Sequence, residues 1–222
     1  MVSVIIAAAG SGTRMKSSIK KQFISLLDIP VLIRTLKQFD LEEIDEIIIV
    51  TNEDDIDSVK DMIDLYEVNK VDHVIPGGQN RQDSIYNGLK VAKGDVVMIH
   101  DAARPFVDRE IIIRNIKAVS DHVGVVTCVP CKDTIKVVKD EFVKETLERS
   151  ELMNIQTPQT FITKEIKEAY DHVMARKISV TDDASVAEIY GIAVRTVMGS
   201  YQNIKLTTPE DLWMGEAILK RG

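Results

Sequence analysis

The sequence of 222 residues has few of the features that indicate export, membrane insertion or binding to a large polyanion. It contains two cysteines and 5% aromatic residues, and no apolar run approaches the length of a membrane span. A formal net charge of −7 argues against DNA or RNA as a partner, since such a polyanion needs a broad basic face. The first residues enter a strand-like segment without a basic stretch or a cleavage site. We therefore expect a cytoplasmic protein whose partners include neither a membrane nor a nucleic acid.

The two cysteines stand as Cys128-Val-Pro-Cys131, formally a C-x-x-C pattern. A structural zinc site needs a second ligand pair, and the sequence offers no further cysteine and no suitably spaced histidine pair. A thioredoxin-type pair opens a helix, whereas this pair lies between strand-like stretches at 123–127 and 133–138. We interpret both cysteines as packing thiols. The four histidines have no partner at triad-like spacing, so nucleophilic catalysis by a Ser–His or Cys–His pair has no support.

Short segments rich in valine and isoleucine alternate with helical patterns along the chain. This alternation predicts an α/β fold, a mostly parallel, Rossmann-like sheet with helices on both faces. The length fits one core, so we expect a single domain over 1–222. Expected strands cover 2–7, 46–51, 71–75, 95–100, 123–129 and 192–197, and expected helices lie near 31–39, 53–66, 82–92, 108–119, 163–175, 182–190 and 209–220. Expected helix N-caps are Asp108, Thr163, Thr181 and Thr208.

A loop of small residues follows the first expected strand and reads Ala7-Ala8-Ala9-Gly10-Ser11-Gly12-Thr13-Arg14-Met15, with Lys20 and Lys21 beyond it. Such a turn lets backbone N–H groups approach an anion, and the cations then add charge next to phosphates. Met15 stands where a dinucleotide loop needs a third small residue, and the G-K-[S/T] of a P-loop is absent. The loop predicts a triphosphate site of a third kind, although a plain strand-to-helix turn is the structural alternative.

Residues 133–149 break the strand–helix alternation. Apolar and polar residues alternate on both sides of a polar Lys139-Asp140-Glu141, a pattern typical of a β-hairpin. An isolated hairpin is marginal in water unless its apolar face is covered. We expect a protruding β-hairpin arm that packs on a second subunit and makes the protein a homodimer. Packing of the hairpin on its own body is the alternative.

A carboxylate stands at the end of the fourth expected strand, in His100-Asp101-Ala102-Ala103-Arg104-Pro105. Ligands of parallel α/β folds bind outside the carboxyl ends of the strands. Asp101 could hold Mg²⁺ there, since this ion prefers oxygen ligands and keeps most of its waters beside a triphosphate. A turn or capping carboxylate is the structural alternative. Neighbouring strand residues point to opposite faces, so we expect no His100–Asp101 dyad.

Two further segments add groups that suit a nucleotide. Gly77-Gly78-Gln79-Asn80-Arg81-Gln82-Asp83-Ser84 begins as a tight turn and enters a helix, where the backbone and the Ser84 hydroxyl could read a base. Arg81 could be plain surface charge. Lys205 is expected in a short strand before the last helix, where its ammonium suits a phosphate, although a solvated face of the strand is the structural alternative. Arginine, lysine, one aspartate and glycine loops together favour direct displacement at phosphorus, which needs charge neutralisation and alignment.

Taken together, these segments resemble 2-C-methyl-D-erythritol 4-phosphate cytidylyltransferases over nearly the whole chain. The matching motifs occur in the family's order: Ala8-Ala9-Gly10-Ser11-Gly12-Thr13-Arg14-Met15, Lys21-Gln22-Phe23, Gly77-Gly78, His100-Asp101-Ala102-Ala103-Arg104-Pro105, Thr157-Pro158-Gln159, Thr181-Asp182-Asp183-Ala184-Ser185 and Asn203-Ile204-Lys205. The resemblance implies transfer of CMP from CTP to methylerythritol phosphate. The products would be the CDP-alcohol and pyrophosphate, in the non-mevalonate route to isoprenoids.

The resemblance also implies roles for single residues. Arg14, Lys21 and Lys205 would act on the CTP phosphates and stabilise the reacting phosphorus, and Asp101 would lie beside Mg²⁺ and the ribose. The other implied nucleotide-binding residues are Ala8, Ala9, Gly10, Gly12, Gly78 and Ser84. Those implied for the alcohol phosphate are Arg104, Thr134, Arg149, Thr157 and Thr181, some of them supplied by the partner's arm in a homodimer.

Two positions depart from the family's common pattern. Gln79 replaces an acid that often follows the glycine pair, so any base contact there must use the amide. Lys20 replaces a common proline, which leaves open whether Lys20 shares the role of Lys21.

Two other functions are alternatives to the one that the resemblance implies. The first is a ribitol 5-phosphate cytidylyltransferase of cell-wall polymer synthesis. The small residues Ala102 and Ala103, together with Thr181-Asp182-Asp183-Ala184-Ser185, favour methylerythritol phosphate over it. The second is a non-catalytic nucleotide-binding module on the same fold. The joint presence of four residues argues against such a module, because a mere binder needs no cations directed at the leaving group: Arg14, Lys21, Asp101 and Lys205.

Overall fold

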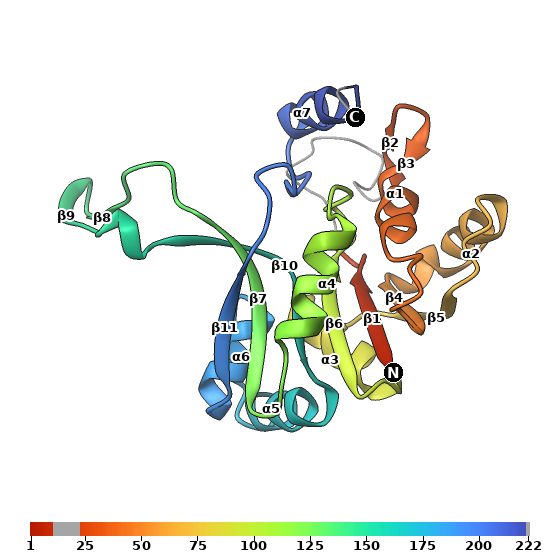
Figure 1. Ribbon diagram of the computed structural model, residues 1–222, viewed down its shortest axis with the longest axis horizontal. Coiled ribbons are helices and arrows are strands. Elements are labelled where there is room, and N and C mark those ends of the chain that lie inside the picture. Colours follow the sequence, from red (N-terminus) through yellow and green to blue (C-terminus); the bar gives the residue numbers. More distant parts are fainter. Residues whose placement is uncertain (11–22, 221–222) are drawn as a thin grey trace.

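A seven-stranded sheet forms the centre of the computed structural model, which describes residues 1–10 and 23–220 (Figure 1). The strand order is β11–β7–β10–β6–β1–β4–β5. Only β10 runs antiparallel to its neighbours β6 and β7, and the other pairs of this sheet are parallel, so the predicted fold class is confirmed. The strands are β1 (Val2–Ala7), β4 (Glu46–Thr51), β5 (Val71–Pro76), β6 (Val96–Asp101), β7 (Val123–Pro130), β10 (Met153–Ile162) and β11 (Ala193–Met198).

Helices cover both faces of this sheet. Helices α1 (Val31–Gln38), α2 (Ile56–Leu65) and α4 (Arg109–Ala118) pack on one face. Helices α3 (Arg81–Val91), α5 (Thr163–Ala175) and α6 (Asp183–Tyr190) pack on the other. Within the described ranges, no helix has the length and apolar content needed to cross a membrane.

Strand β1 shows why the fold has two cores. Its side chains alternate between the faces of the sheet, so that Val4 and Ile6 join the core under α1, α2 and α4. Ile5 joins the core under α3, α5 and α6. All three side chains are fully buried, which explains the continuous apolar run of this strand.

The C-terminal helix α7 (Pro209–Leu219) lies beside a small sheet of β2 (Ser25–Leu26) and β3 (Ile29–Pro30). Leu26 from this sheet and Leu212 from α7 belong to a third, smaller apolar cluster. The helix begins where the sequence predicts, because Thr208 is its N-cap and the Asp211 carboxylate accepts the Thr208 N–H at 2.8 Å.

The other predicted boundaries are mostly confirmed. The expected strands correspond to β1, β4, β5, β6, β7 and β11, and each expected helix is present, with a 3₁₀ turn at Glu53–Asp55 leading into α2. Asp108 caps α4 by accepting the N–H of Ile111. The predictions for Thr163 and Thr181 are wrong by one residue. Ile162 is the N-cap of α5, and the Asp182 carboxylate caps α6 by accepting the N–H of Ser185 at 3.1 Å.

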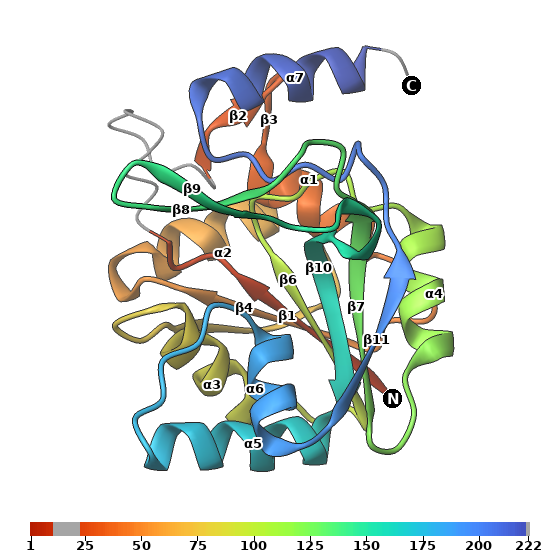
Figure 2. The ribbon, with the colours of Figure 1, turned by 90° about the vertical axis from the view of Figure 1, so that its left-hand side faces the viewer.

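The predicted arm is a two-stranded hairpin of β8 (Lys136–Lys139) and β9 (Phe142–Thr146), which projects from the body in Figure 1 and lies in front of it in Figure 2. Asp140 and Glu141 both have positive φ angles, 49° and 68°, as a two-residue type I′ hairpin turn requires. Every residue of both strands is exposed, including Phe142 at 79%. The described residues of the body therefore leave the hairpin uncovered, and the alternative of packing on its own body is wrong for this part of the chain. A 3₁₀ turn at Arg149–Glu151 ends the arm and contains Arg149, the last residue of the predicted segment 133–149.

Candidate functional site

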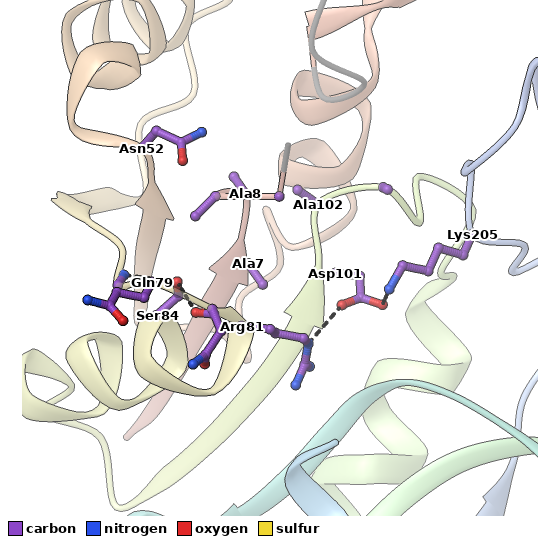
Figure 3. A pocket seen from close by; sticks show the side chains of 14 residues that line it. Ala7, Ala8, Asn52, Gln79, Arg81, Ser84, Asp101, Ala102 and Lys205 are labelled. Carbon is purple, nitrogen blue, oxygen red and sulfur yellow. Dashed lines mark hydrogen bonds and ion pairs between the residues drawn. The ribbon is translucent and has the colours of Figure 1, made fainter. Parts of the chain in front are cut away.

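A cavity of about 410 Å³ opens at the carboxyl ends of β1 and β6, where the parallel sheet predicts a ligand site (Figure 3). Three separate segments, 7–10, 78–84 and 101–103, and two single residues meet around it. Its lining consists of Ala7, Ala8, Ala9, Gly10, Asn52, Gly78, Gln79, Asn80, Arg81, Ser84, Asp101, Ala102, Ala103 and Lys205. The cavity thus joins seven residues singled out in the sequence: Ala8, Ala9, Gly10, Gly78, Ser84, Asp101 and Lys205. Gly12, Arg14, Lys20 and Lys21 lie outside the described residues.

The glycine pair after β5 lets this turn approach the β1 loop closely. A Cβ at Gly77 would lie 2.8 Å from both the Ala9 Cβ and the Ser84 Oγ, too close for any side chain. The N–H of Gly78 donates to the Ser84 Oγ at 3.1 Å, and the Ser84 hydroxyl donates to the carbonyl of Asn80 at 2.8 Å. Ser84 therefore holds the turn in shape and uses its only proton to do so.

Three cations surround the carboxylate of Asp101, whose side chain is 8% exposed. The Nζ of Lys205 lies 2.8 Å from Oδ2, the Nε of Arg104 lies 3.4 Å from Oδ2, and the Nε of Arg81 lies 3.5 Å from Oδ1. Burial by itself would raise the pKa of Asp101, but Lys205, Arg81 and Arg104 hold that pKa well below its usual range. Asp101 is therefore ionised throughout the physiological range.

The segment that carries Lys205 is not the short strand expected from the sequence, and that prediction is wrong. Side chains hold it in place of a ladder of backbone bonds. Asn203 is fully buried and its Nδ2 donates to the carbonyl of Thr157 at 2.9 Å. The Nη1 of Arg104 donates to the carbonyl of Asn203 at 2.8 Å. Lys205 thus owes its position to β10 and to the loop after β6.

Thr157 and His100 support Asp101 from the interior. The Thr157 hydroxyl accepts the N–H of Asp101 at 3.1 Å and lies 3.0 Å from the Nδ1 of His100. The Nε2 of His100 lies 3.0 Å from the carbonyl of Arg104, which can only accept, so Nε2 carries the proton and Nδ1 accepts from Thr157. Burial lowers the pKa of His100 to about 4, so the ring is neutral at pH 7. His100 therefore forms no dyad with Asp101, as expected.

Arg81 was interpreted as possible surface charge, and the structure contradicts this. Its guanidinium forms a bidentate pair with Asp183, with N–O distances of 3.1 and 2.7 Å, besides facing Asp101. Burial lowers the pKa of Arg81, but the two carboxylates more than offset this and raise it above the usual value. No local signal in the sequence could have identified the pair, because Asp183 lies 102 residues away.

None of the residues implied for the alcohol phosphate lines the cavity of this chain. Arg104 and Thr157 adjoin Asp101, and Thr181 is exposed just before the cap of α6. Thr134 and Arg149 lie on the arm and are exposed, and the Nη1 of Arg149 donates to the carbonyl of Lys132 at 3.3 Å. One copy of the chain therefore brings Arg104 and Thr157 beside Asp101, while Thr134 and Arg149 lie at the two ends of the arm and outside the lining of the cavity.

The side chains around the cavity suit a metal ion whose ligands are mostly water and phosphate oxygens rather than protein groups. In residues 1–10 and 23–220, no group of three or more His, Cys, Asp or Glu side chains could hold a metal ion. Asp101 offers a single ionised carboxylate, which fits Mg²⁺ bound to water and phosphate oxygens.

Cys128 and Cys131 are free, and Cys128 is buried on β7, in agreement with a packing role.

Sequence and structure comparisons identify relatives along the whole chain. Residues 2–221 match the sequence model of the 2-C-methyl-D-erythritol 4-phosphate cytidylyltransferase family. The chain is 48% identical to the 2-C-methyl-D-erythritol 4-phosphate cytidylyltransferase of Clostridium botulinum strain Langeland, over 99% of this chain and 97% of the relative.

Solved structures extend the match to three dimensions. The 4-diphosphocytidyl-2C-methyl-D-erythritol synthase of Anaerococcus prevotii superposes with a TM-score of 0.86 at 36% identity, over 99% of this chain and 96% of that chain. The Francisella tularensis 2-C-methyl-D-erythritol 4-phosphate cytidylyltransferase superposes with a TM-score of 0.80 at 32% identity, over 97% and 98% of the two chains. The resemblance inferred from the motifs is confirmed, and the chain belongs to the 2-C-methyl-D-erythritol 4-phosphate cytidylyltransferase family, a family of CTP-dependent nucleotidyltransferases.

Proposed function

We propose that this chain acts at the cavity beside Asp101 as a cytoplasmic homodimer, with residues 1–222 forming one domain. There it transfers CMP from CTP to 2-C-methyl-D-erythritol 4-phosphate and releases pyrophosphate, in the non-mevalonate isoprenoid pathway. Membership of the family supports the reaction. The observation that supports the location most directly is that the β1 loop, the glycine turn, Asp101 and Lys205 line one cavity although they lie far apart in the sequence.

In this proposal the base of CTP lies between the β1 loop and the glycine turn. The backbone of Ala8, Ala9 and Gly78 encloses cytosine, and the phosphates extend toward Gly10 and Gly12. The proton of the Ser84 hydroxyl is already donated to Asn80, so Ser84 can offer a base only a lone pair. An acceptor of this kind suits the exocyclic amino group of cytosine.

The proposed chemistry is a single displacement at the α-phosphorus of CTP. A phosphate oxygen of methylerythritol phosphate forms a bond to this phosphorus. The bond from the phosphorus to the oxygen bridging it to the β-phosphate breaks, and pyrophosphate leaves with that electron pair. The proposal assigns Arg14, Lys21 and Lys205 to neutralise the charge that builds up on the phosphate oxygens.

Asp101 is the residue that we propose to lie beside Mg²⁺ and the ribose. When bound, Mg²⁺ would neutralise part of the triphosphate charge. The support is chemical, because Asp101 is an ionised oxygen donor on the wall of the cavity.

The alcohol phosphate is proposed to bind between two copies of the chain. Arg104, Thr157 and Thr181 would come from one copy, and Thr134 and Arg149 from the arm of the other. Two features support this arrangement. The arm presents exposed apolar side chains such as Phe142, and the exposed guanidinium of Arg149 suits a phosphate through paired hydrogen bonds.

The test is pyrophosphate release from CTP in parallel reactions with methylerythritol phosphate, with ribitol 5-phosphate and with no alcohol phosphate. We expect release that depends on methylerythritol phosphate and is at least about tenfold slower with ribitol 5-phosphate. Faster release with ribitol 5-phosphate would establish the cell-wall enzyme instead. CTP binding without release under any of these conditions would establish a silent nucleotide-binding module.

A further inference from the structure

Asp101 is held from two opposite sides, as Figure 3 shows. Lys205 and Arg104 both contact its Oδ2, at 2.8 and 3.4 Å, and the Nε of Arg81 faces its Oδ1 at 3.5 Å. A carboxylate contacted at one oxygen can rotate about its Cβ–Cγ bond, whereas partners on both oxygens fix its plane. Arg81 therefore supplies the second point that fixes the orientation of Asp101.

Arg81 is itself held rigidly. It is the first residue of α3, and both of its terminal nitrogens bond Asp183, the first residue of α6. Asp183 is fully buried, and its Oδ1 also accepts the hydroxyl of Tyr170 at 2.6 Å. The ring of Tyr170 stacks on Tyr86 of α3 with centroids 6.1 Å apart. The guanidinium is thus anchored by two helices before it reaches the cavity.

The contacts of Arg81 need the shape of a guanidinium. It presents two terminal N–H groups to Asp183 and its Nε to Asp101, so one planar group neutralises two buried carboxylates. An ammonium is a point charge without a fixed plane, and it cannot bond one carboxylate in a bidentate manner while facing another. Lysine at this position would keep the charge but lose the geometry.

We propose that Arg81 is a positioning residue of the transfer reaction, which aligns the carboxylate of Asp101 for the nucleotide and has no catalytic contact of its own. This inference rests on the proposed function, because Asp101 is assigned there to the ribose and the metal. It predicts that Arg81 matters only while Asp101 carries its carboxylate.

The first test compares Arg81→Lys with Arg109→Lys. Arg109 is an exposed arginine of α4 that pairs with Glu43, so its variant controls for loss of a guanidinium elsewhere. Misalignment of a group near the reacting atoms typically costs up to about a hundredfold, so Arg81→Lys should lower kcat about ten- to a hundredfold. The KM for CTP should change less than kcat, and Arg109→Lys should leave both unchanged. An unchanged kcat in Arg81→Lys would overturn the proposal.

The decisive test is a double-mutant cycle with Asp101→Asn, followed by pyrophosphate release at high enzyme concentration. If Arg81 acts through Asp101, adding Arg81→Lys to Asp101→Asn should change kcat by less than about twofold. A full, additive loss would overturn the proposal, since it would mean that Arg81 touches the nucleotide itself or only stabilises the fold.

Two further measurements ensure that the proposal can be contradicted even if one variant does not fold. If Arg81→Lys does not fold, Asp183→Asn is tested instead, because it removes the anchor of the guanidinium and keeps the guanidinium itself. The same decrease in kcat is expected, and so is the same non-additive cycle with Asp101→Asn. The assay of the unmodified enzyme separates this inference from the proposed function. An inactive unmodified enzyme contradicts the function, whereas an active enzyme with an additive cycle contradicts only the role of Arg81.

Discussion

The cavity and the β8–β9 arm of this protein differ in how their side chains are fixed. At the cavity, Asp101 and Asp183 are buried carboxylates, and each has cationic partners from distant parts of the same chain. On the arm, Phe142 and Val143 are 79% and 60% exposed, and both strands are exposed along their length. Contacts within one chain thus fix these two carboxylates, whereas the arm presents an apolar surface that its own described body does not cover.

The arm also differs in where its shape comes from. A two-residue turn at Asp140 and Glu141 sets the pairing of β8 with β9 locally. No comparable local rule sets the cavity, whose wall combines segments from residue 7 to residue 205. Substitutions at the cavity should therefore alter turnover and leave dimer assembly intact. Substitutions on the arm should weaken dimer assembly and leave turnover intact, unless they remove a group that the active site of the neighbouring subunit uses.

Removal of divalent metal is expected to have the largest effect, and at the cavity only. In excess EDTA, pyrophosphate release should fall by at least about three orders of magnitude, because the triphosphate charge is no longer neutralised, and added Mg²⁺ should restore it. Size-exclusion chromatography should show the same dimer throughout. Asp101→Asn should raise the Mg²⁺ concentration needed for half-maximal activity. Full activity in excess EDTA would contradict the metal assignment, and an unchanged Mg²⁺ requirement in Asp101→Asn would remove Asp101 from the surroundings of the metal.

Loss of a phosphate-binding cation should come next. We expect Lys21→Ala to lower kcat by about two to three orders of magnitude, because it removes charge stabilisation from the transition state. The neighbouring Lys20→Ala serves as the matched control and should stay within a few-fold of the unmodified enzyme. If Lys20→Ala shows the large decrease in kcat instead and Lys21→Ala stays within a few-fold of the unmodified enzyme, Lys20 is the residue that acts on the phosphates.

Mixed dimers test whether the two regions meet across a subunit boundary. Arg149→Ala and Lys21→Ala homodimers should each be nearly inactive. In a shared site, a mixed dimer has one site with both defects and one with neither, so random exchange should restore about a quarter of the unmodified activity. Subunit exchange has to be shown independently with tagged chains. Verified mixed dimers without activity would mean that Arg149 does not serve the partner's site.

The smallest effect on folding should follow from a change on the arm. Phe142→Ser should change the free energy of unfolding of the monomer by less than about 0.5 kcal/mol, since the side chain is exposed in one chain. The same change should weaken the dimer, as measured by analytical ultracentrifugation. Ile5→Ala, in a fully buried position, is the control and should cost about 2–5 kcal/mol. A dimer of unchanged strength in Phe142→Ser would show that the tip of the arm lies outside the interface.

Strand β10 shows where prediction from the sequence failed in the fold. Five of the ten residues in Met153–Ile162 are β-branched or aromatic, but Pro158 interrupts the segment and weakens a local strand prediction. The segment is inserted antiparallel between β6 and β7, with an irregularity between Ile155 and Gln159. Pairing with both neighbours makes it a strand in spite of the proline, and the same pairing places Thr157 beneath Asp101.

The sequence by itself determined the parallel α/β fold, because buried strands and amphipathic helices each require a local pattern that can be read directly. It also determined that the β1 loop, the glycine turn and Asp101 meet at one edge, since successive parallel strands end on the same side of a sheet. Only the tertiary structure decided that Arg81 pairs with Asp183 and Asp101, and that Asn203 and Arg104 hold the segment of Lys205. These contacts join residues that are up to 102 positions apart, so they depend on how α3, α6 and β10 pack together, which no local pattern records.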